Sequence, residues 1–256
     1  MKITSKKLLL WLHSTSPQER RRVPISHLDL ILSELTPEGR QSLVRYLENN
    51  RLLFADELDG PIKLSLSSHG LTQLEADFPA LRRLNHPWEG DWLLIIFTES
   101  PSTDNNFRYL RSVLLQEHCL SLKRGVYLHA GELSQRLENL LHANYRSSVV
   151  IVKTSSWEFG DPQIVIGQNE VLKDVIDVYS GIGKELETLL TNFSTIKRLS
   201  DRQKKEIGSI YDRIVQNFQQ DNGIIPYFYQ NASTGIELLE RLKLEVNSKL
   251  NPSQED

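Results

Sequence analysis

Cysteine is almost absent from this chain of 256 residues, in which Cys119 stands alone. A single thiol excludes an internal disulfide framework and favours a reducing compartment, so we expect a cytoplasmic protein. Long apolar runs are missing as well. The N-terminal LLLWL stretch is too short for the apolar core of a signal peptide or for a membrane span, and we expect no membrane contact.

Motifs that bind phosphate or metal are also missing. Neither a GxxxxGK[ST] nor a GxGxxG pattern occurs, which excludes the usual phosphate loops. The seven histidines are scattered, and we interpret Cys119, which follows His118, as a buried structural residue rather than a nucleophile. We therefore expect no catalytic residues, no metal and no cofactor, and predict that the protein is not an enzyme.

A strong basic excess is absent too, because the net charge is −3. Residues 1–87 hold 12 Lys and Arg against 10 Asp and Glu, whereas residues 156–256 hold 11 against 16. The asymmetry points to the N-terminal region as the more basic one. A nucleic-acid-binding protein usually shows a clearer basic surface, so charge alone does not indicate a function.

The first 87 residues have the pattern of three helices followed by a hairpin. Helices are predicted over residues 4–14, over 26–35 with Ser26 as N-cap, and over 37–50 with Thr36 as N-cap and Pro37 in the first turn. Two short strand-like runs then flank Asp59-Gly60, a pair that favours a tight turn, and a further helix is predicted over residues 70–83. This order is that of a winged helix-turn-helix domain, in which the third helix enters the major groove of DNA.

The third predicted helix has one apolar face and one polar face. Leu43, Val44 and Leu47 share the apolar side at helical spacing. The residues that we expect to contact DNA bases or flank them are Arg40, Gln41, Ser42, Arg45 and Asn49. The residues that we expect to meet phosphates are Lys6, Lys7 and Lys63.

An ordinary surface helix shows the same two-faced pattern, so solvation of the polar face is the alternative interpretation. The hairpin tip carries Asp56, Glu57 and Asp59, and like charge facing phosphate is unfavourable. We therefore expect that the tip does not contact the DNA backbone closely.

Residues 88–155 show the order strand-helix-strand-strand-helix-strand. The run Trp92–Phe97 predicts a strand buried on both sides, helices follow over 103–117 and 133–143, and the apolar strand SVVIVKT ends the region. This order predicts a ferredoxin-like sandwich. Residues 156–256 are expected to be mostly helical, with Ser200 and Gln203 forming a capping box and a frayed tail at the end. The fold class is thus α+β in three parts: 1–87, 88–155 and 156–256.

Three stretches, in this order, resemble the PaaX-like transcriptional regulators. They are SLVRYLENNRLL with KLSLSSHGLTQLE, then PWEGDWLLIIFTESP with FRYLRSVLLQEHCLSLKRGVYLHAG, then QQDNGIIPYFY. The residues that fall in the second pattern are Trp88, Gly90, Trp92, Arg108, Arg111, Gly125 and Val126. In the third stretch, Asp221, Ile224 or Ile225, and Pro226 match. The chain departs from the family at Arg51, where glycine usually precedes the wing, at Asn222, which replaces a proline, and after Tyr229, where the usual tryptophan is missing.

The resemblance implies a DNA-binding repressor controlled by a small-molecule effector. The central region also resembles the small nuclease-like subunit of CRISPR spacer acquisition. Described nucleases of that kind carry a metal-binding Asp at the end of the first strand, where this chain has Thr98, and Glu99 is one residue out of register. Nuclease activity is therefore not expected. A homodimer bound to an inverted-repeat operator is our main hypothesis, and a non-catalytic adaptor or nuclease-like protein acting through the central region is the alternative.

Overall fold

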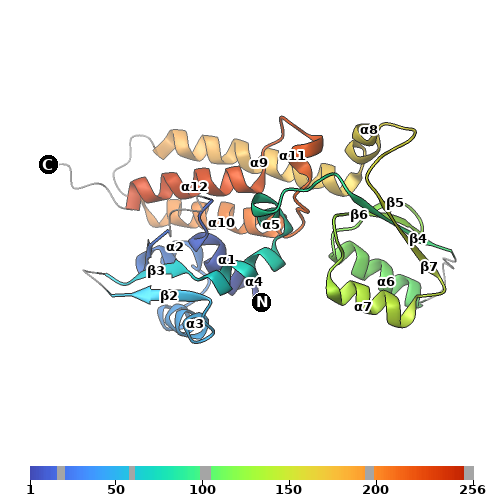
Figure 1. The fold of residues 1–256 in the computed structure, drawn as a ribbon. Coiled ribbons are helices and arrows are strands. Elements are labelled where there is room, and N and C mark those ends of the chain that lie inside the picture. Colours follow the sequence, from blue (N-terminus) through green and yellow to red (C-terminus); the bar gives the residue numbers. More distant parts are fainter. Residues whose placement is uncertain (16–20, 58–60, 99–104, 194–198, 251–256) are drawn as a thin grey trace.

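The computed structural model describes residues 1–15, 21–57, 61–98, 105–193 and 199–250. Within these ranges the chain is an α+β protein with two antiparallel sheets, one near the N-terminus and one in the middle of the sequence. Figure 1 shows the middle sheet at one end of an elongated molecule and the N-terminal sheet near the other end. Among the described residues, no helix is both long and apolar enough to cross a membrane.

The N-terminal region places three helices ahead of a hairpin, as the sequence predicts. The elements are α1 (Ile3–Leu12), β1 (Val23–Pro24), the 3-10 turn η1 (Ile25–His27), α2 (Leu28–Ile31), α3 (Pro37–Asn49), β2 (Leu53–Asp56), β3 (Lys63–Leu66), α4 (Ser68–Asp77) and α5 (Pro79–Asn85). The strand β1 joins the hairpin, so that the sheet runs in the order β1-β3-β2. Asp59 and Gly60, the expected turn residues, lie outside the described residues.

Two predictions for this region are wrong in detail. The second helix is shorter than expected, and Ser26 makes no side-chain cap because it lies inside η1. The single helix expected over 70–83 is divided at Phe78, which has extended backbone angles and precedes Pro79. Proline disfavours a helical conformation in the residue before it, which accounts for the break, and the buried Phe78 ring stacks on Phe218 at 5.4 Å.

The middle region contains the order strand-helix-strand-strand-helix-strand that the sequence predicts. The elements are β4 (Trp92–Phe97), α6 (Asn105–Gln116), β5 (Leu120–Lys123), β6 (Val126–Ala130), α7 (Gln135–Asn144) and β7 (Val149–Thr154). The strands are arranged as β5-β6-β4-β7, and every neighbouring pair is antiparallel. Figure 1 shows α6 and α7 together against one face of this sheet.

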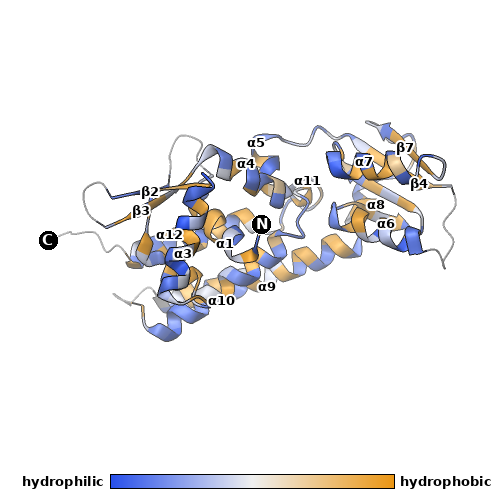
Figure 2. Cartoon of the chain, turned by 90° about the horizontal axis from the view of Figure 1, so that it is seen from below, coloured by the Kyte–Doolittle hydropathy of each residue, from blue (hydrophilic) through white to orange (hydrophobic). Residues whose placement is uncertain are grey.

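The C-terminal region is helical, as expected. It contains α8 (Pro162–Gly167), α9 (Glu170–Phe193), α10 (Asp201–Phe218), α11 (Ile225–Phe228) and α12 (Gly235–Leu250). The predicted capping box of Ser200 and Gln203 opens α10. Figure 2 shows hydrophobic and hydrophilic residues alternating along α9 and α10, the pattern of helices that bury one face.

The first and third regions pack around a shared hydrophobic core that contains residues from Leu8 to Val246. Two hydrogen bonds cross inside it: the Tyr211 hydroxyl donates to the Lys7 carbonyl at 2.5 Å, and Lys243 Nζ donates to the His13 carbonyl at 2.7 Å. The sheet of the middle region packs on α6 and α7 through a second core. The N-terminal helices are therefore held by the C-terminal helices, while α6 and α7 have their own support.

Candidate nucleic-acid interface

The start of α3 and the face that it buries both follow from its sequence. The Thr36 hydroxyl accepts a hydrogen bond from the Gly39 amide at 3.2 Å, and Pro37 occupies a first-turn position where no amide donor is needed. Val44 and Leu47 are buried on the inner side. The opposite side of α3 is consequently presented to solvent, beside β2 (Figure 1).

A tight turn connects α3 to the hairpin. Arg51 adopts φ 58°, and the Leu52 amide that follows donates to the Leu47 carbonyl at 2.9 Å. The Ser67 hydroxyl donates to the Arg51 carbonyl at 2.6 Å and accepts from the Gly70 amide at 2.9 Å. A Cβ atom at Gly70 would meet the Leu52 carbonyl oxygen at 2.0 Å, so only glycine allows this approach. These contacts fix the angle between α3 and the hairpin.

Four of the predicted DNA-contacting residues lie together on α3. Gln41, Ser42, Arg45 and Asn49 are all exposed on its outer side. Arg40 differs, because its guanidinium pairs with Asp29 at 3.0 Å and its side chain is only 15% exposed. The outer side of α3 therefore offers one arginine and three amide or hydroxyl side chains to a partner, together with the carboxylate of Glu38.

The predicted phosphate contacts are mostly placed elsewhere. Lys7 was expected to meet phosphate, but its side chain is 5% exposed and its ammonium pairs with Glu34 at 2.7 Å and Asp212 at 2.6 Å. That prediction is wrong, because Lys7 belongs to the packing between α1, the segment that follows α2, and α10. Lys6 pairs with Asp77 at 2.9 Å, away from α3, and is likewise not part of this surface. Lys63 is exposed on β3, opposite Asp56 of β2.

Two residues of this surface were missed by the sequence reasoning. Tyr46 is 57% exposed beside Arg45, and Arg51 is exposed at the end of α3. The helical periodicity was not applied to Tyr46, although its position on the helix is next to the polar side. The charge along α3 is balanced, since Arg40 and Arg45 stand against Glu38 and Glu48.

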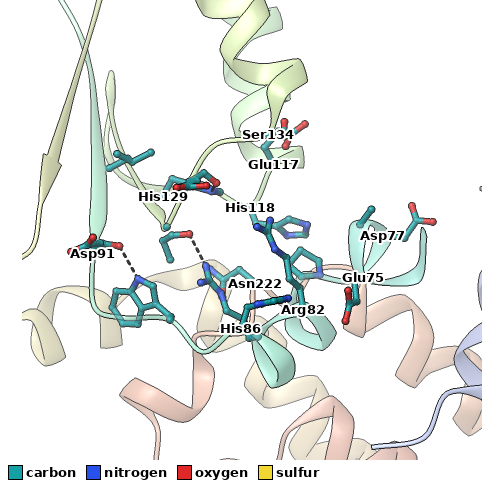
Figure 3. A pocket seen from close by; sticks show the side chains of 18 of the residues that line it. Glu75, Asp77, Arg82, His86, Asp91, Glu117, His118, His129, Ser134 and Asn222 are labelled. Atoms are coloured by element: carbon teal, nitrogen blue, oxygen red, sulfur yellow. Dashed lines mark hydrogen bonds between the residues drawn. The ribbon is translucent and has the colours of Figure 1, made fainter. Parts of the chain in front are cut away.

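A polar cleft of about 810 Å³ lies between α5 and the middle region. Figure 3 shows Arg82 and His86 on one side and Glu117, His118 and His129 on the other. The walls are linked where the Arg83 guanidinium donates to the Ala130 carbonyl at 2.6 Å. Both signs of charge line the cleft, so it is suited to a polar small molecule rather than to a simple anion or cation.

The histidines and the cysteine beside the cleft are neutral structural groups. Burial lowers the pKa of His118 and of His129, and His129 Nε2 lies 3.0 Å from the Glu132 carbonyl. Cys119 Sγ lies 3.6 Å from His129 Nδ1, but burial raises the pKa of the thiol well above its ordinary value. Cys119 is buried, as predicted. Among the described residues, no three His, Cys, Asp or Glu side chains are grouped to bind a metal.

Comparisons with known proteins add little to this geometry. No family model matches the chain, and no curated protein matches it. Among solved structures, the chain is similar to the uncharacterized protein Rv0674 from Mycobacterium tuberculosis, with 15% identity and a TM-score of 0.42. That match covers 96% of this chain and 100% of the other.

Proposed function

We propose that this protein is a sequence-specific, duplex-DNA-binding transcriptional regulator, acting as a repressor in the cytoplasm. In this proposal, residues 1–87 form a winged helix-turn-helix domain and α3 enters the major groove. Residues 88–155 form a ferredoxin-like sandwich that serves a structural role beside the DNA-binding region and does not cleave nucleic acid. The observation that carries the proposal is the exposed polar side of α3, supported by buried Val44 and Leu47 and flanked by a hairpin.

The chemistry of α3 fits base reading better than phosphate binding. Gln41 and Asn49 carry amides that can pair with adenine, and Arg45 can pair with guanine through two hydrogen bonds. Because the charges of α3 balance, the positive charge near the phosphates comes from Arg51 at the helix end and Lys63 on β3. We therefore expect modest affinity per copy and a strong dependence on a second copy, hence a homodimer on an inverted repeat.

The cleft beside α5 is the place where a small-molecule effector would act. It lies between the middle region and the helices α4 and α5, of which α4 packs on α1. A ligand that bridges Arg82 and Glu117 would change the angle between the middle region and these helices. An effector must bind the DNA-binding conformation and the non-binding conformation with different affinities, because a ligand that binds both equally does not change their populations.

The balanced charge of α3 favours one other function. A non-catalytic adaptor that acts through the middle region would leave the α3 surface solvated, and such a protein needs no positive charge there. The two proposals differ in whether the purified chain selects a DNA sequence.

Selection from a pool of random duplexes tests the proposal. The full chain is incubated with the pool at low salt, bound duplexes are recovered over several rounds, and the recovered sequences are compared. A DNA-binding regulator enriches an inverted repeat with half-site centres about 10 bp apart or a multiple of that spacing. Recovery of the starting distribution after all rounds would instead support the adaptor.

A further inference from the structure

β7 lies at the edge of the middle sheet. It pairs with β4 on one side, and among the described residues no strand lies beside its other side. Its residues Val150, Ile151 and Val152 are 45%, 40% and 46% exposed, in a run without proline or glycine. A flat apolar edge strand is a template for another strand, and proteins usually block such an edge with a charge, a bulge or proline.

The opposite edge of the same sheet is blocked. β5 has a register irregularity between Ser121 and Lys123, and Lys123 and Arg124 end the strand with exposed charges. Leu122, in the same strand, is 37% exposed, so the two edges differ in protection rather than in the presence of apolar side chains. β7 also contains a lysine, Lys153, but its ammonium is paired with Asp91, and the centre of the strand from Val150 to Val152 carries no charge.

The hydrogen-bond pattern shows which groups of β7 are available. The Thr98 amide donates to the Ser148 carbonyl at 3.0 Å, and Ile96 lies opposite Val150. Because alternate residues of an antiparallel strand direct their main-chain groups to the same side, Val150 and Val152 bond to β4. The amides and carbonyls of Ile151 and Lys153 therefore point outward, together with the Val149 carbonyl, whereas the Val149 amide already donates to the Tyr145 carbonyl at 3.0 Å.

We propose that β7 pairs with β7 of a second copy of this chain, antiparallel and centred on Ile151, so that the two sheets become continuous. In this register Ile151 faces Ile151, Val150 lies beside Val152, and Val149 faces Lys153. No like charges oppose one another, and the Lys153 ammonium is already paired with Asp91 at 2.6 Å within its own chain. The amide and carbonyl of Ile151 would bond to Ile151 of the second copy, and the Lys153 amide would donate to the Val149 carbonyl of that copy.

Such a pair closes by symmetry. Both β7 edges are paired across the two-fold axis. The joined sheet then ends on each side at a blocked β5 strand, so no further copy can add and the assembly is a dimer. This inference rests on the homodimer of the proposed function and assigns its interface. It is independent of whether α3 binds DNA.

Charge substitution at the symmetry axis tests the interface by analytical ultracentrifugation without DNA. The unmodified full chain is expected to be a dimer at micromolar concentration. Ile151→Lys and Ile151→Glu each place like charges opposite each other and should raise the dimer dissociation constant by about tenfold or more. An equimolar mixture of these two variants should restore the dimer, because a lysine then faces a glutamate.

Leu122→Lys is the matched control, since Leu122 is similarly exposed on the other edge. It should leave the dimer intact, and far-UV circular dichroism of all three variants reports whether they fold. A monomeric unmodified chain, a dimer that survives Ile151→Lys, or a mixture of variants that stays monomeric would each overturn the β7 pairing. A dimer that survives both single charges would still be compatible with the proposed regulator, so failure of the interface and failure of the function are distinguishable.

Discussion

At the scale of single residues, the most informative positions are those where the backbone or the charge state is forced by its surroundings. Arg51 holds a positive φ that glycine adopts without strain. Asp221 is a carboxyl buried in the shared core.

Arg51→Gly should stabilise the protein. A non-glycine residue in the left-handed region costs the folded state about 1–2 kcal/mol, and glycine removes this cost. Glycine also increases the conformational entropy of the unfolded chain, which offsets part of the gain. We therefore expect an increase of up to about 1 kcal/mol in the free energy of unfolding. Urea denaturation followed by circular dichroism measures it. The matched control is Arg45→Gly inside α3, which should lower the free energy of unfolding by about 1 kcal/mol. A loss of stability in the Arg51 variant would contradict the account of this turn.

Asp221 should make stability fall as pH rises. Burial raises the pKa of its carboxyl from 3.8 to about 6, although the Gly223 amide and the Tyr179 hydroxyl donate to it at 2.8 Å and 3.1 Å. The folded state therefore holds this proton more tightly than the unfolded state, and the protein loses up to about 3 kcal/mol from this group between pH 4 and pH 6.

The comparison is with Asp221→Asn, which keeps an acceptor for the Gly223 amide and cannot ionise. The urea midpoint of each protein is measured from pH 4 to pH 7. The difference between the two midpoints cancels the contribution of the other titrating groups, because both proteins contain them. Relative to the asparagine variant, the unmodified protein should become less stable as pH increases through this window. A difference that stays constant with pH would show that Asp221 is ionised with an ordinary pKa.

At the scale of elements, local sequence signals predicted the start of two helices. Thr36 with Pro37 predicted the start of α3, and the capping box of Ser200 predicted the start of α10, because both caps satisfy amides within the same turn. The division between α4 and α5 was missed although its signal is local, because Pro79 disfavours a helical conformation at Phe78, and Phe78 then packs against Phe218. Likewise, β4 was expected to be buried on both sides, yet Leu93, Leu94 and Ile96 are only half-buried.

In the candidate interface, too, the predictions that depend on local sequence succeeded and one that depends on a distant contact failed. The polar side of α3 followed from helical periodicity, so Gln41, Ser42, Arg45 and Asn49 were found together. Lys7 was misplaced because nothing in its neighbourhood indicates that Asp212, on a helix that begins about two hundred residues later, comes to its ammonium. A charged residue near the N-terminus is usually solvated, and only the packing of α1 on α10 reverses that expectation.

At the scale of the whole molecule, the two ends of the sequence form one body. α10 packs on α2 and contacts α1 through Tyr211, which lies against Trp11 and donates to the Lys7 carbonyl, so the N-terminal helices depend on the C-terminal helices for support. The polar cleft and the β7 edge both involve the middle region, so the proposed ligand and the proposed second copy would both act through it. Each of these roles stands on a separate observation and can fail separately.

The central claim is that α3 reads duplex DNA, and the affinity of the Arg45→Ala variant tests it most directly. Fluorescence anisotropy with a duplex recovered from the random pool, titrated at several salt concentrations, gives the dissociation constant of each protein. Arg45→Ala should weaken binding by about 1–3 kcal/mol, which is about fivefold to more than a hundredfold. Arg146→Ala, which removes an exposed arginine of the middle region, should bind like the unmodified chain. Equal affinity of the Arg45 and Arg146 variants at every salt concentration would contradict the claim.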